Sequence, residues 1–341
     1  MAGPEADGQS MSVYVDDRWI GPHGIGRFAS EVASRCGFLP AQLPGKPLDL
    51  LDPWRLRQAL LRQRPYHFFS PGFNAPIGTP CSFSLTIHDL IHLEVADEIS
   101  LAKRMYYRWV VLPAVHHADV VFTVSEYSRQ KIADWSGVTL DRIVVAGNGV
   151  SDAFAPEGVR WAWPKPYLLY VGNQKPHKNV EGLVRGYAAS KLSAEVDLLL
   201  TGTLSDAVAT VAAQYGVLDR VKALGLVHES DLPRLYRGAM ALVMPSRYEG
   251  FGLPVVEAMA SGVAVLSSDR TSLPEVGGDA VAYFSPDDVE SLVQGLDDLQ
   301  DEAHRMRLRA AGLARAKGFR WESVAARVSG AIAERVGPRP D

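Results

Sequence analysis

The chain has 341 residues, of which 47% are hydrophobic and 22% are charged, and its formal net charge is −4. This length suggests two domains of ordinary size, and the composition excludes a largely disordered chain. The negative charge argues against a nucleic-acid partner, and the count of two cysteines excludes a disulfide framework and fits a reducing cytoplasm.

The first residues include acidic side chains where a secretory signal would carry basic ones, and no window holds the 18 apolar residues of a membrane span. We therefore expect a cytoplasmic protein that is neither exported nor anchored by a span. Peripheral contact with the inner face of the membrane stays open.

Strands and helices alternate along the first half of the chain. The runs typical of buried strands are residues 12–15, 82–87, 119–124 and 143–145. Apolar residues at helical spacing occupy residues 54–64 and 101–117. Ser125 is placed to cap a further helix. The alternation predicts an α/β domain with a parallel sheet over residues 12–160.

A linker rich in proline and tryptophan, residues 155–166, precedes a second series of strands. These predicted strands are residues 167–171, 197–201, 221–224, 241–244 and 263–267. We expect a second α/β domain over residues 165–320 and a last helix over residues 321–336 that packs across the domains. Two doubly wound, Rossmann-like domains would face each other across a cleft lined by the loops at their strand ends.

The most informative segment is residues 245–262, PSRYEGFGLPVVEAMASG. Pro254 suits the start of a helix, and the loop before it contains Gly250, Phe251 and Gly252. The unpaired N–H groups of Gly252 and Leu253 would point toward an anion, which glycines allow to approach closely. The segment therefore predicts a phosphate site.

Two carboxylates flank this phosphate site. Glu249 precedes the helix, and we place Glu257 in its first turn. Carboxylates accept hydrogen bonds from hydroxyl groups, so the pair would hold the two sugars at the ends of a diphosphate, as in a nucleotide sugar. The alternative is that both are solvated glutamates favoured by the helix dipole.

A second candidate loop, residues 172–179, follows the strand at 167–171 and contains Asn173, Lys175 and Lys178. Lysines between a strand and a helix can neutralise a diphosphate leaving group. We favour Lys178 because it stands nearer the helix start. An exposed turn with ordinary surface lysines is the alternative.

Together these segments resemble the retaining glycosyltransferases of family 4, which have the GT-B fold. The motif that carries the resemblance is E-x7-E, from Glu249 to Glu257, followed by AMASGVAVLSSD and LPEVGGDA. The segments GNQKPHKN and LGLVHESDLPRLYRGAMALVMPS are similar to the donor-binding loops of that family. The resemblance is strong over residues 165–325 and looser over residues 12–150.

The resemblance implies a role for each of these residues. Glu249 would contact hydroxyls of the transferred sugar, Glu257 the ribose, and Lys178 the diphosphate. Backbone groups near Val227 and His228 would face the base. Glu249 and Lys178 are thus expected to be catalytic.

One position departs from the family pattern. Many members carry arginine where Asn173 stands, five residues before Lys178. Either Lys175 supplies the missing charge, or the phosphate clamp is weaker here.

A glycine-rich segment, GPHGIGR, follows the first strand. It is not the GxGxxG fingerprint, so a dinucleotide oxidoreductase is disfavoured. The resemblance implies that Gly24 and Gly26 lie in a loop that faces the donor phosphates, and it suggests an acceptor contact for Arg27.

His88 opens the segment HDLIH, which resembles a two-histidine zinc helix with aspartate in place of glutamate. The run before it reads as a strand, however, so His88 would stand at a strand end over the cleft. The resemblance implies a catalytic or acceptor-binding histidine beside the transferred sugar; a structural histidine is the alternative. The sequence has no P-loop and no DxD triplet, and we expect no metal and no cofactor.

The helical segments at 54–64 and 103–117 mix basic and aromatic residues. We expect each to have one core face and one solvated arginine face. Contact with an anionic membrane that carries a lipid-linked acceptor is the alternative.

The resemblance implies transfer of a sugar to a hydroxyl of a glycan or lipid-linked acceptor, with retention at the anomeric carbon. Members with a similar PHKN loop suggest mannose from GDP-mannose, and UDP-glucose or a deoxysugar donor are the alternatives. A nucleotide-sugar epimerase or phosphorylase with the same fold, or a noncatalytic nucleotide-sugar-binding subunit, are the alternatives.

Overall fold

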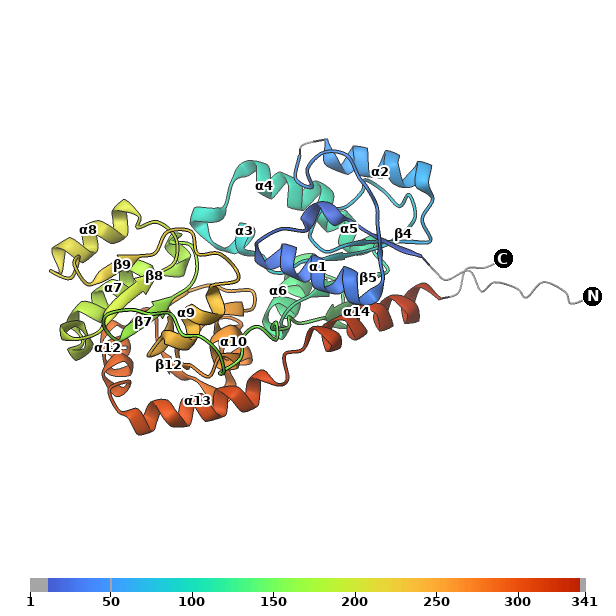
Figure 1. The fold of residues 1–341 in the computed structure, drawn as a ribbon. Coiled ribbons are helices and arrows are strands. Elements are labelled where there is room, and N and C mark those ends of the chain that lie inside the picture. Colours follow the sequence, from blue (N-terminus) through green and yellow to red (C-terminus); the bar gives the residue numbers. More distant parts are fainter. Residues whose placement is uncertain (1–11, 50, 338–341) are drawn as a thin grey trace, which may run out of the picture.

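The computed structural model of the protein describes residues 12–49 and 51–337 (Figure 1). It contains two six-stranded sheets, with strand orders β2-β1-β3-β4-β5-β6 and β12-β11-β10-β7-β8-β9. Every strand pair in both sheets is parallel. Helices cover both faces of each sheet, as parallel sheets require. The predicted pair of doubly wound α/β units is therefore confirmed.

The first sheet is built from residues 13–145. Its strands in chain order are β1 (Val13–Val15), β2 (Leu39–Pro40), β3 (His67–Ser70), β4 (Ser82–Thr86), β5 (Val120–Thr123) and β6 (Ile143–Val145). The helices of this half are α1 (Gly24–Cys36), α2 (Asp52–Gln63), α3 (Ile91–Glu94), α4 (Leu101–Tyr106), α5 (Leu112–His117) and α6 (Glu126–Ser136). A π-helical turn, Tyr107–Val111, joins α4 to α5, so the predicted helix at 101–117 is continuous but irregular.

The second sheet is built from residues 167–284. Its strands in chain order are β7 (Tyr167–Tyr170), β8 (Asp197–Leu200), β9 (Val221–Ala223), β10 (Ala241–Met244), β11 (Ala264–Ser268) and β12 (Ala282–Phe284). Its helices are α7 (Val180–Ala189), α8 (Asp206–Gln214), α9 (Leu232–Gly238), α10 (Leu253–Ala260), α11 (Leu273–Gly277), α12 (Val289–Asp298) and α13 (Glu302–Ala316).

Three short strands, β2, β3 and β12, were not among those predicted. β3 has the sequence HFFS, in which His67 and Ser70 interrupt the apolar run that identifies a buried strand. All four of its residues are nevertheless buried. His67 is accommodated because its ring nitrogens bond the hydroxyls of Ser82 and Ser84 on the neighbouring strand, at 2.7 and 2.9 Å.

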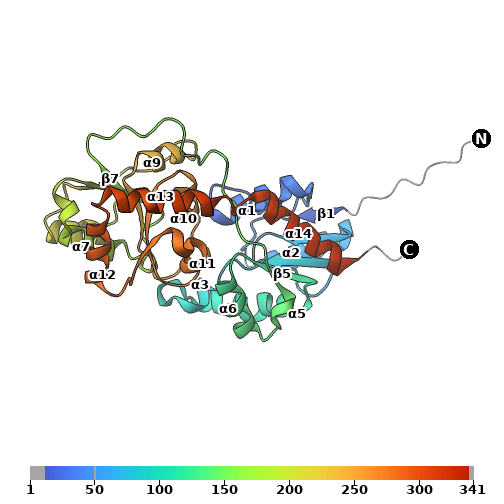
Figure 2. The same ribbon diagram turned by 90° about the horizontal axis from the view of Figure 1, so that it is seen from below.

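The chain ends with α14 (Trp321–Val336), which returns to the first half. α13 and α14 follow one another along one side of the molecule, α13 on the second half and α14 on the first (Figures 1 and 2). α14 packs with α1 over one face of the first sheet, where Trp321 is buried against Phe28. Among the residues that the structure describes, no helix combines the length and apolar character needed to cross a bilayer.

Each sheet has one point where its strand order reverses. In the first sheet it lies between β1 and β3, and in the second between β7 and β10. Loops that leave the carboxyl ends of such neighbouring strands diverge to opposite faces of the sheet and leave a crevice between them. The segments with the candidate residues follow β1, β4, β7, β9 and β10, and of these strands β1, β7 and β10 border a reversal point.

Candidate active site

Lys178 and Glu249 meet at the reversal point of the second sheet. Lys178 ends a short turn, Pro176–Lys178, after β7, and Glu249 follows β10, the neighbour of β7. The ammonium Nζ lies 2.7 and 2.8 Å from the two carboxylate oxygens of Glu249. Both side chains are largely shielded from solvent. Two candidates that stand 71 residues apart thus form one ion pair, which the sequence reasoning had not foreseen.

The loop with Glu249 is fixed by hydrogen bonds from two sides. Within the second half, the Glu249 N–H donates to Thr271 Oγ1 at 3.0 Å, and Ser272 Oγ donates to the Glu249 carbonyl at 2.9 Å. From the first half, Ser125 Oγ donates to the Gly250 carbonyl at 2.7 Å. Ser125 also caps α6, as predicted, by accepting from Ser128 N. The loop therefore joins the two halves.

Gly250 leaves no space between this loop and the first half. A Cβ atom built on Gly250 would lie 2.8 Å from Asp89 Oδ2 and 2.9 Å from the His88 carbonyl oxygen. Side-chain atoms do not come so close to backbone without a shift of one partner. Glycine is thus required here by the contact with residues 88 and 89.

The start of α10 faces the start of α1. Gly252 precedes α10 in the left-handed region, with φ of 100°, and no side chain caps the first N–H groups of the helix. The Leu253 side chain lies 3.7 Å from the Cβ position of Gly24. Phe251 differs from its neighbours because its ring is buried against Phe319, so only its backbone can face a ligand.

Glu257 lies in the second turn of α10, not in the first as expected, because the helix begins at Leu253. Its side chain is only 4% exposed. Tyr236 Oη donates to one carboxylate oxygen at 2.8 Å, and the Arg27 guanidinium donates to the other. Arg27 also bonds Glu229 Oε1 at 2.6 Å. An arginine of the first half therefore bridges two acids of the second.

Gly24 and Gly26 lie in the first turn of α1, not in a loop before it. The His23 side chain caps this helix by accepting from Gly26 N at 2.9 Å. A Cβ on Gly26 would come within 2.2 Å of the Gly21 carbonyl oxygen. Only glycine fits at position 26, because the backbone of Gly21 packs against it. Gly24 is the glycine that faces α10.

His88 stands directly after β4, as predicted. Its Nε2 lies 2.9 Å from the Pro71 carbonyl oxygen, so Nε2 carries the proton and Nδ1 keeps its lone pair. Burial lowers the pKa of His88 to about 4, and the ring is neutral at pH 7. α3 begins only at Ile91, so His88 and His92 do not share a helix and the zinc-helix alternative is wrong.

Asp89 is a site residue that the sequence reasoning missed. Its carboxylate contacts the Gly250 position and accepts from Ile91 N at 3.0 Å. Burial, with the negative charge of Glu249, raises the pKa of Asp89 to about 6, although Lys178 and the Ile91 N–H oppose this. The sequence signal for Asp89 is its place beside His88, directly after a predicted strand.

Lys175 points away from the Lys178–Glu249 pair toward the first half. Its ammonium lies 2.7 Å from Glu98 Oε1, and Lys103 lies 3.5 Å from the other oxygen of that carboxylate. The Asn173 side chain accepts from Lys175 N at 3.3 Å. Lys175 is therefore already neutralised by another partner in this arrangement.

Val227 and His228 lie in the segment that precedes Glu229. His228 is exposed and bonds Ser230 Oγ at 2.7 Å, and Val227 is half-buried against the core of the second half. The next residue, Glu229, holds the same arginine that binds Glu257. This shared partner places the segment beside Glu257, and neither Glu229 nor Tyr236 was foreseen.

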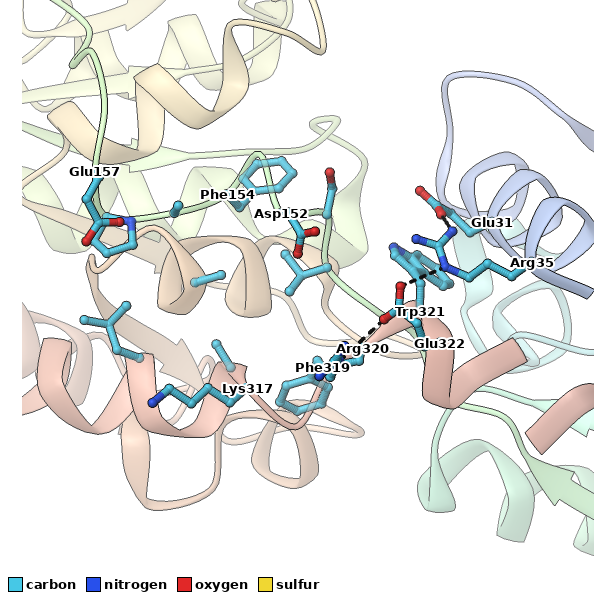
Figure 3. A pocket seen from close by; sticks show the side chains of 17 residues that line it. Glu31, Arg35, Asp152, Phe154, Glu157, Lys317, Phe319, Arg320, Trp321 and Glu322 are labelled. Atoms are coloured by element: carbon cyan, nitrogen blue, oxygen red, sulfur yellow. Dashed lines mark hydrogen bonds and ion pairs between the residues drawn. The ribbon is translucent and has the colours of Figure 1, made fainter. Parts of the chain in front are cut away.

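A pocket of about 860 Å³ lies away from these residues, where the chain crosses between the halves (Figure 3). Its lining includes Asp152, Lys317 and Trp321, and none of the predicted site residues. Arg35 and Glu322, which both line it, are bonded at 3.1 Å (Figure 3). Over residues 12–49 and 51–337, no group of three or more acidic, histidine or cysteine side chains is arranged to hold a metal ion.

Two family models match the chain over almost its whole length. "Glycosyltransferase Family 4" matches residues 17–154, and "Glycosyl transferases group 1" matches residues 155–315. The junction between the two matches falls at the start of the proline- and tryptophan-rich linker.

Relatives and solved structures agree with these matches. An O-antigen chain mannosyltransferase B of Escherichia coli is 34% identical, over 85% of this chain and 81% of its own length. A serotype-specific mannosyltransferase WbdA of the same species is 30% identical over 75% of this chain, which spans only 33% of that larger protein. Sucrose-phosphate synthase from Thermosynechococcus elongatus has the same fold, with a TM-score of 0.79, 17% identity, and coverage of 95% of this chain and 99% of that one.

Proposed function

We propose that this chain, which belongs to the family 4 glycosyltransferases, transfers mannose from GDP-mannose to a hydroxyl of a glycan or lipid-linked acceptor with retention at the anomeric carbon. The names of the relatives, which are mannosyltransferases, support the choice of sugar. The observation that carries the site is the Lys178–Glu249 ion pair beside the uncapped start of α10.

In this proposal the donor diphosphate lies between Lys178 and the first N–H groups of α10. The bond between the sugar C1 and the diphosphate oxygen breaks, and a bond from C1 to the acceptor oxygen forms on the same face. The acceptor proton passes to an oxygen of the departing diphosphate, so no side-chain nucleophile is needed. Stabilisation of the charge on that leaving group is the main contribution of the protein.

Glu249 and His88 would hold the transferred sugar. Because Lys178 binds both oxygens of Glu249, that carboxylate is already ionised and oriented, and it retains lone pairs for sugar hydroxyls. The neutral His88 ring offers Nδ1 as an acceptor for one more hydroxyl. Closure of the two halves would exclude water, since hydrolysis of the donor competes with transfer.

The donor can be tested by thermal shift with GDP-mannose, GDP-fucose and UDP-glucose. A ligand at about a hundredfold excess over its Kd stabilises the native state by about 2.7 kcal/mol, so a specific donor is easily recognised. We expect the largest shift with GDP-mannose. A shift with UDP-glucose and none with GDP-mannose would overturn the proposed donor.

Product analysis separates transfer from the two other reactions. Incubation with donor alone should yield neither a second nucleotide sugar, as an epimerase gives, nor mannose 1-phosphate when inorganic phosphate is added, as a phosphorylase gives. With acceptor, NMR of the product should show the anomeric configuration of the donor. Turnover should persist in EDTA, because lysine and helix N–H groups meet the diphosphate charge in this proposal.

We also propose that α4 and the turn after it touch an anionic membrane. Leu101, Met105 and Trp109 stand four residues apart on one helix face and are 78%, 50% and 65% exposed. Arg104 and Arg108 lie between them and form no ion pair with any residue of the described chain. The sequence predicted one buried apolar face and one solvated arginine face for this segment. The structure shows in addition these three exposed apolar side chains beside the arginines. Such a mixture suits the interface of an anionic bilayer.

Vesicle sedimentation tests this contact. Wild-type protein should bind vesicles of phosphatidylglycerol and phosphatidylcholine more than vesicles of phosphatidylcholine alone. The double variant Leu101→Ser/Trp109→Ser should lose most of that binding. Met306→Ser, which removes a similarly exposed apolar residue from α13, should not. Equal binding by all three proteins would contradict the proposal.

A further inference from the structure

One guanidinium joins the two halves of the molecule at the nucleoside end of the cleft. Arg27 extends from the first turn of α1, and its two terminal nitrogens bond Glu257 and Glu229 of the second half. The three side chains thus form a bridge across the cleft. In the roles that the family resemblance implies for the proposed donor, Glu257 would receive the ribose and the segment before Glu229 would receive the base.

The Glu257 carboxylate keeps lone pairs for a ligand, but the approach to them is almost closed, because its side chain is only 4% exposed. Tyr236 donates to one of its oxygens and Arg27 to the other, and the residue is almost wholly buried. Tyr236 is completely buried within its own half, whereas the Arg27 side chain remains 21% exposed. A ribose hydroxyl that bonds Glu257 must therefore displace or share the position of Arg27, because Tyr236 is not free to leave.

A displaced Arg27 has an anion close at hand. Gly24, three residues before it, faces Leu253 at the start of α10, and Leu253 precedes Glu257 by about one helical turn, or about 6 Å. The donor diphosphate would lie at that start. Lys178 is the cation that the proposed function already places at the diphosphate, and Lys175 is turned toward Glu98 of the first half.

We infer that Arg27 is a donor-binding residue with two positions: it bonds Glu257 and Glu229 as the structure shows, and it moves onto the diphosphate when a ribose hydroxyl bonds Glu257. The inference rests on the proposed function. Many family members carry an arginine where Asn173 stands in this chain. In this inference Arg27 of the first half supplies that second positive charge for the diphosphate. Binding of the nucleoside and delivery of the charge to the leaving group are then one coupled step.

Calorimetry with matched ligands tests this coupling. Guanosine carries the ribose without phosphate, whereas GDP carries both, and uridine and UDP form a parallel pair. In Arg27→Ala the nucleoside should bind more tightly than in wild type, because its competitor is gone. The diphosphate should lose affinity relative to the nucleoside. The Kd of the nucleoside divided by the Kd of the diphosphate should therefore fall roughly tenfold or more.

Two further variants keep the test sharp. Arg27→Lys retains the charge and should retain most of the preference for the diphosphate, which guards against a general effect of the alanine variant on folding. Arg35→Ala removes an arginine from the far end of α1 and should leave both affinities unchanged. Turnover by Arg27→Ala should fall even at saturating donor.

The outcomes separate this inference from the proposed function. If wild-type protein binds GDP or UDP but Arg27→Ala shows the same Kd ratio and the same kcat, the role of Arg27 is overturned and the donor assignment stands. If wild-type protein binds neither nucleotide, both are overturned.

Discussion

The two glutamates of the E-x7-E segment are neutralised in different ways. Glu249 receives its cation, Lys178, from a neighbouring loop of the same sheet, whereas Glu257 receives Arg27 from the opposite half. The first pair is set by the adjacency of β7 and β10 and exists once the second half has folded. The second pair forms only where the halves meet. The ion pair at the sugar end thus belongs to one half, whereas the ion pair at the nucleoside end depends on both.

The largest effect is expected at the sugar end. Lys178→Ala should lower kcat/KM about 100- to 1000-fold, because it removes a cation that stabilises the leaving group. Steady-state transfer assays measure this, and circular dichroism should show an intact fold. Lys317→Ala, a lysine at the pocket between the halves, is the matched control and should be neutral. Wild-type turnover by Lys178→Ala would remove the basis for this site.

Gly250 tests the contact between the halves directly. Gly250→Ala places a methyl group against Asp89 and the His88 carbonyl, and we expect the strain of about 1–3 kcal/mol to lower kcat/KM about tenfold. Gly330→Ala in α14 meets nothing within 4 Å and should raise stability by about 0.5–1 kcal/mol without any loss of activity. Equal activities of the two variants would show that the halves do not work in contact.

Tyr236 tests the nucleoside end with a smaller effect on turnover. Tyr236→Phe removes the hydrogen bond to Glu257, lowers the free energy of unfolding by about 1.5–3 kcal/mol, and should raise the donor KM severalfold. Tyr167→Phe loses a comparable buried hydrogen bond to the Leu235 carbonyl and should leave the donor KM unchanged. An unchanged KM in both variants would argue against a role of Glu257 in donor binding.

The smallest effect concerns pH. The lowered pKa of His88, about 4, means that stability is lost as the pH falls from about 6.5 toward 4, because only the unfolded histidine takes up a proton. The raised pKa of Asp89, about 6, has the opposite sign: its contribution is present below about 4 and is lost as the pH rises to about 6. The two neighbours therefore oppose each other in this range.

Variants separate the two contributions. Asp89→Asn should lose more thermal stability than wild type between pH 7 and pH 4.5, and His88→Asn should lose less. Thermal melts at the two pH values give the comparison. Both residues keep part of their surface open, so the differences should amount to a few degrees at most. Parallel pH profiles for all three proteins would show that neither group titrates as stated.

The sequence was sufficient where a site residue follows directly from a strand. His88 was predicted at a strand end, Lys178 between a strand and a helix, and Glu249 before a helix, and the strands of one parallel sheet put their carboxyl ends on one edge. The doubly wound fold followed from the alternation of strands and helices, although the short strand β3 was missed because a histidine and a serine obscure its pattern.

Contacts between the halves could not be predicted in the same way. Arg27 stands 230 residues before Glu257, and no periodicity or spacing relates them. The same holds for Asp89 against Gly250 and for Lys175 against Glu98, since each depends on how two separately folded sheets are docked. The exposure of Leu101, Met105 and Trp109 could not be predicted either, because it depends on which face of the helix packs against the core.

A crystal structure with bound GDP tests the central claim most directly. We predict the β-phosphate within hydrogen-bond distance of Lys178 Nζ and the Leu253 N–H, with the ribose on Glu257. A diphosphate bound elsewhere, such as in the pocket beside Trp321, with Lys178 and Glu257 untouched, would contradict the account.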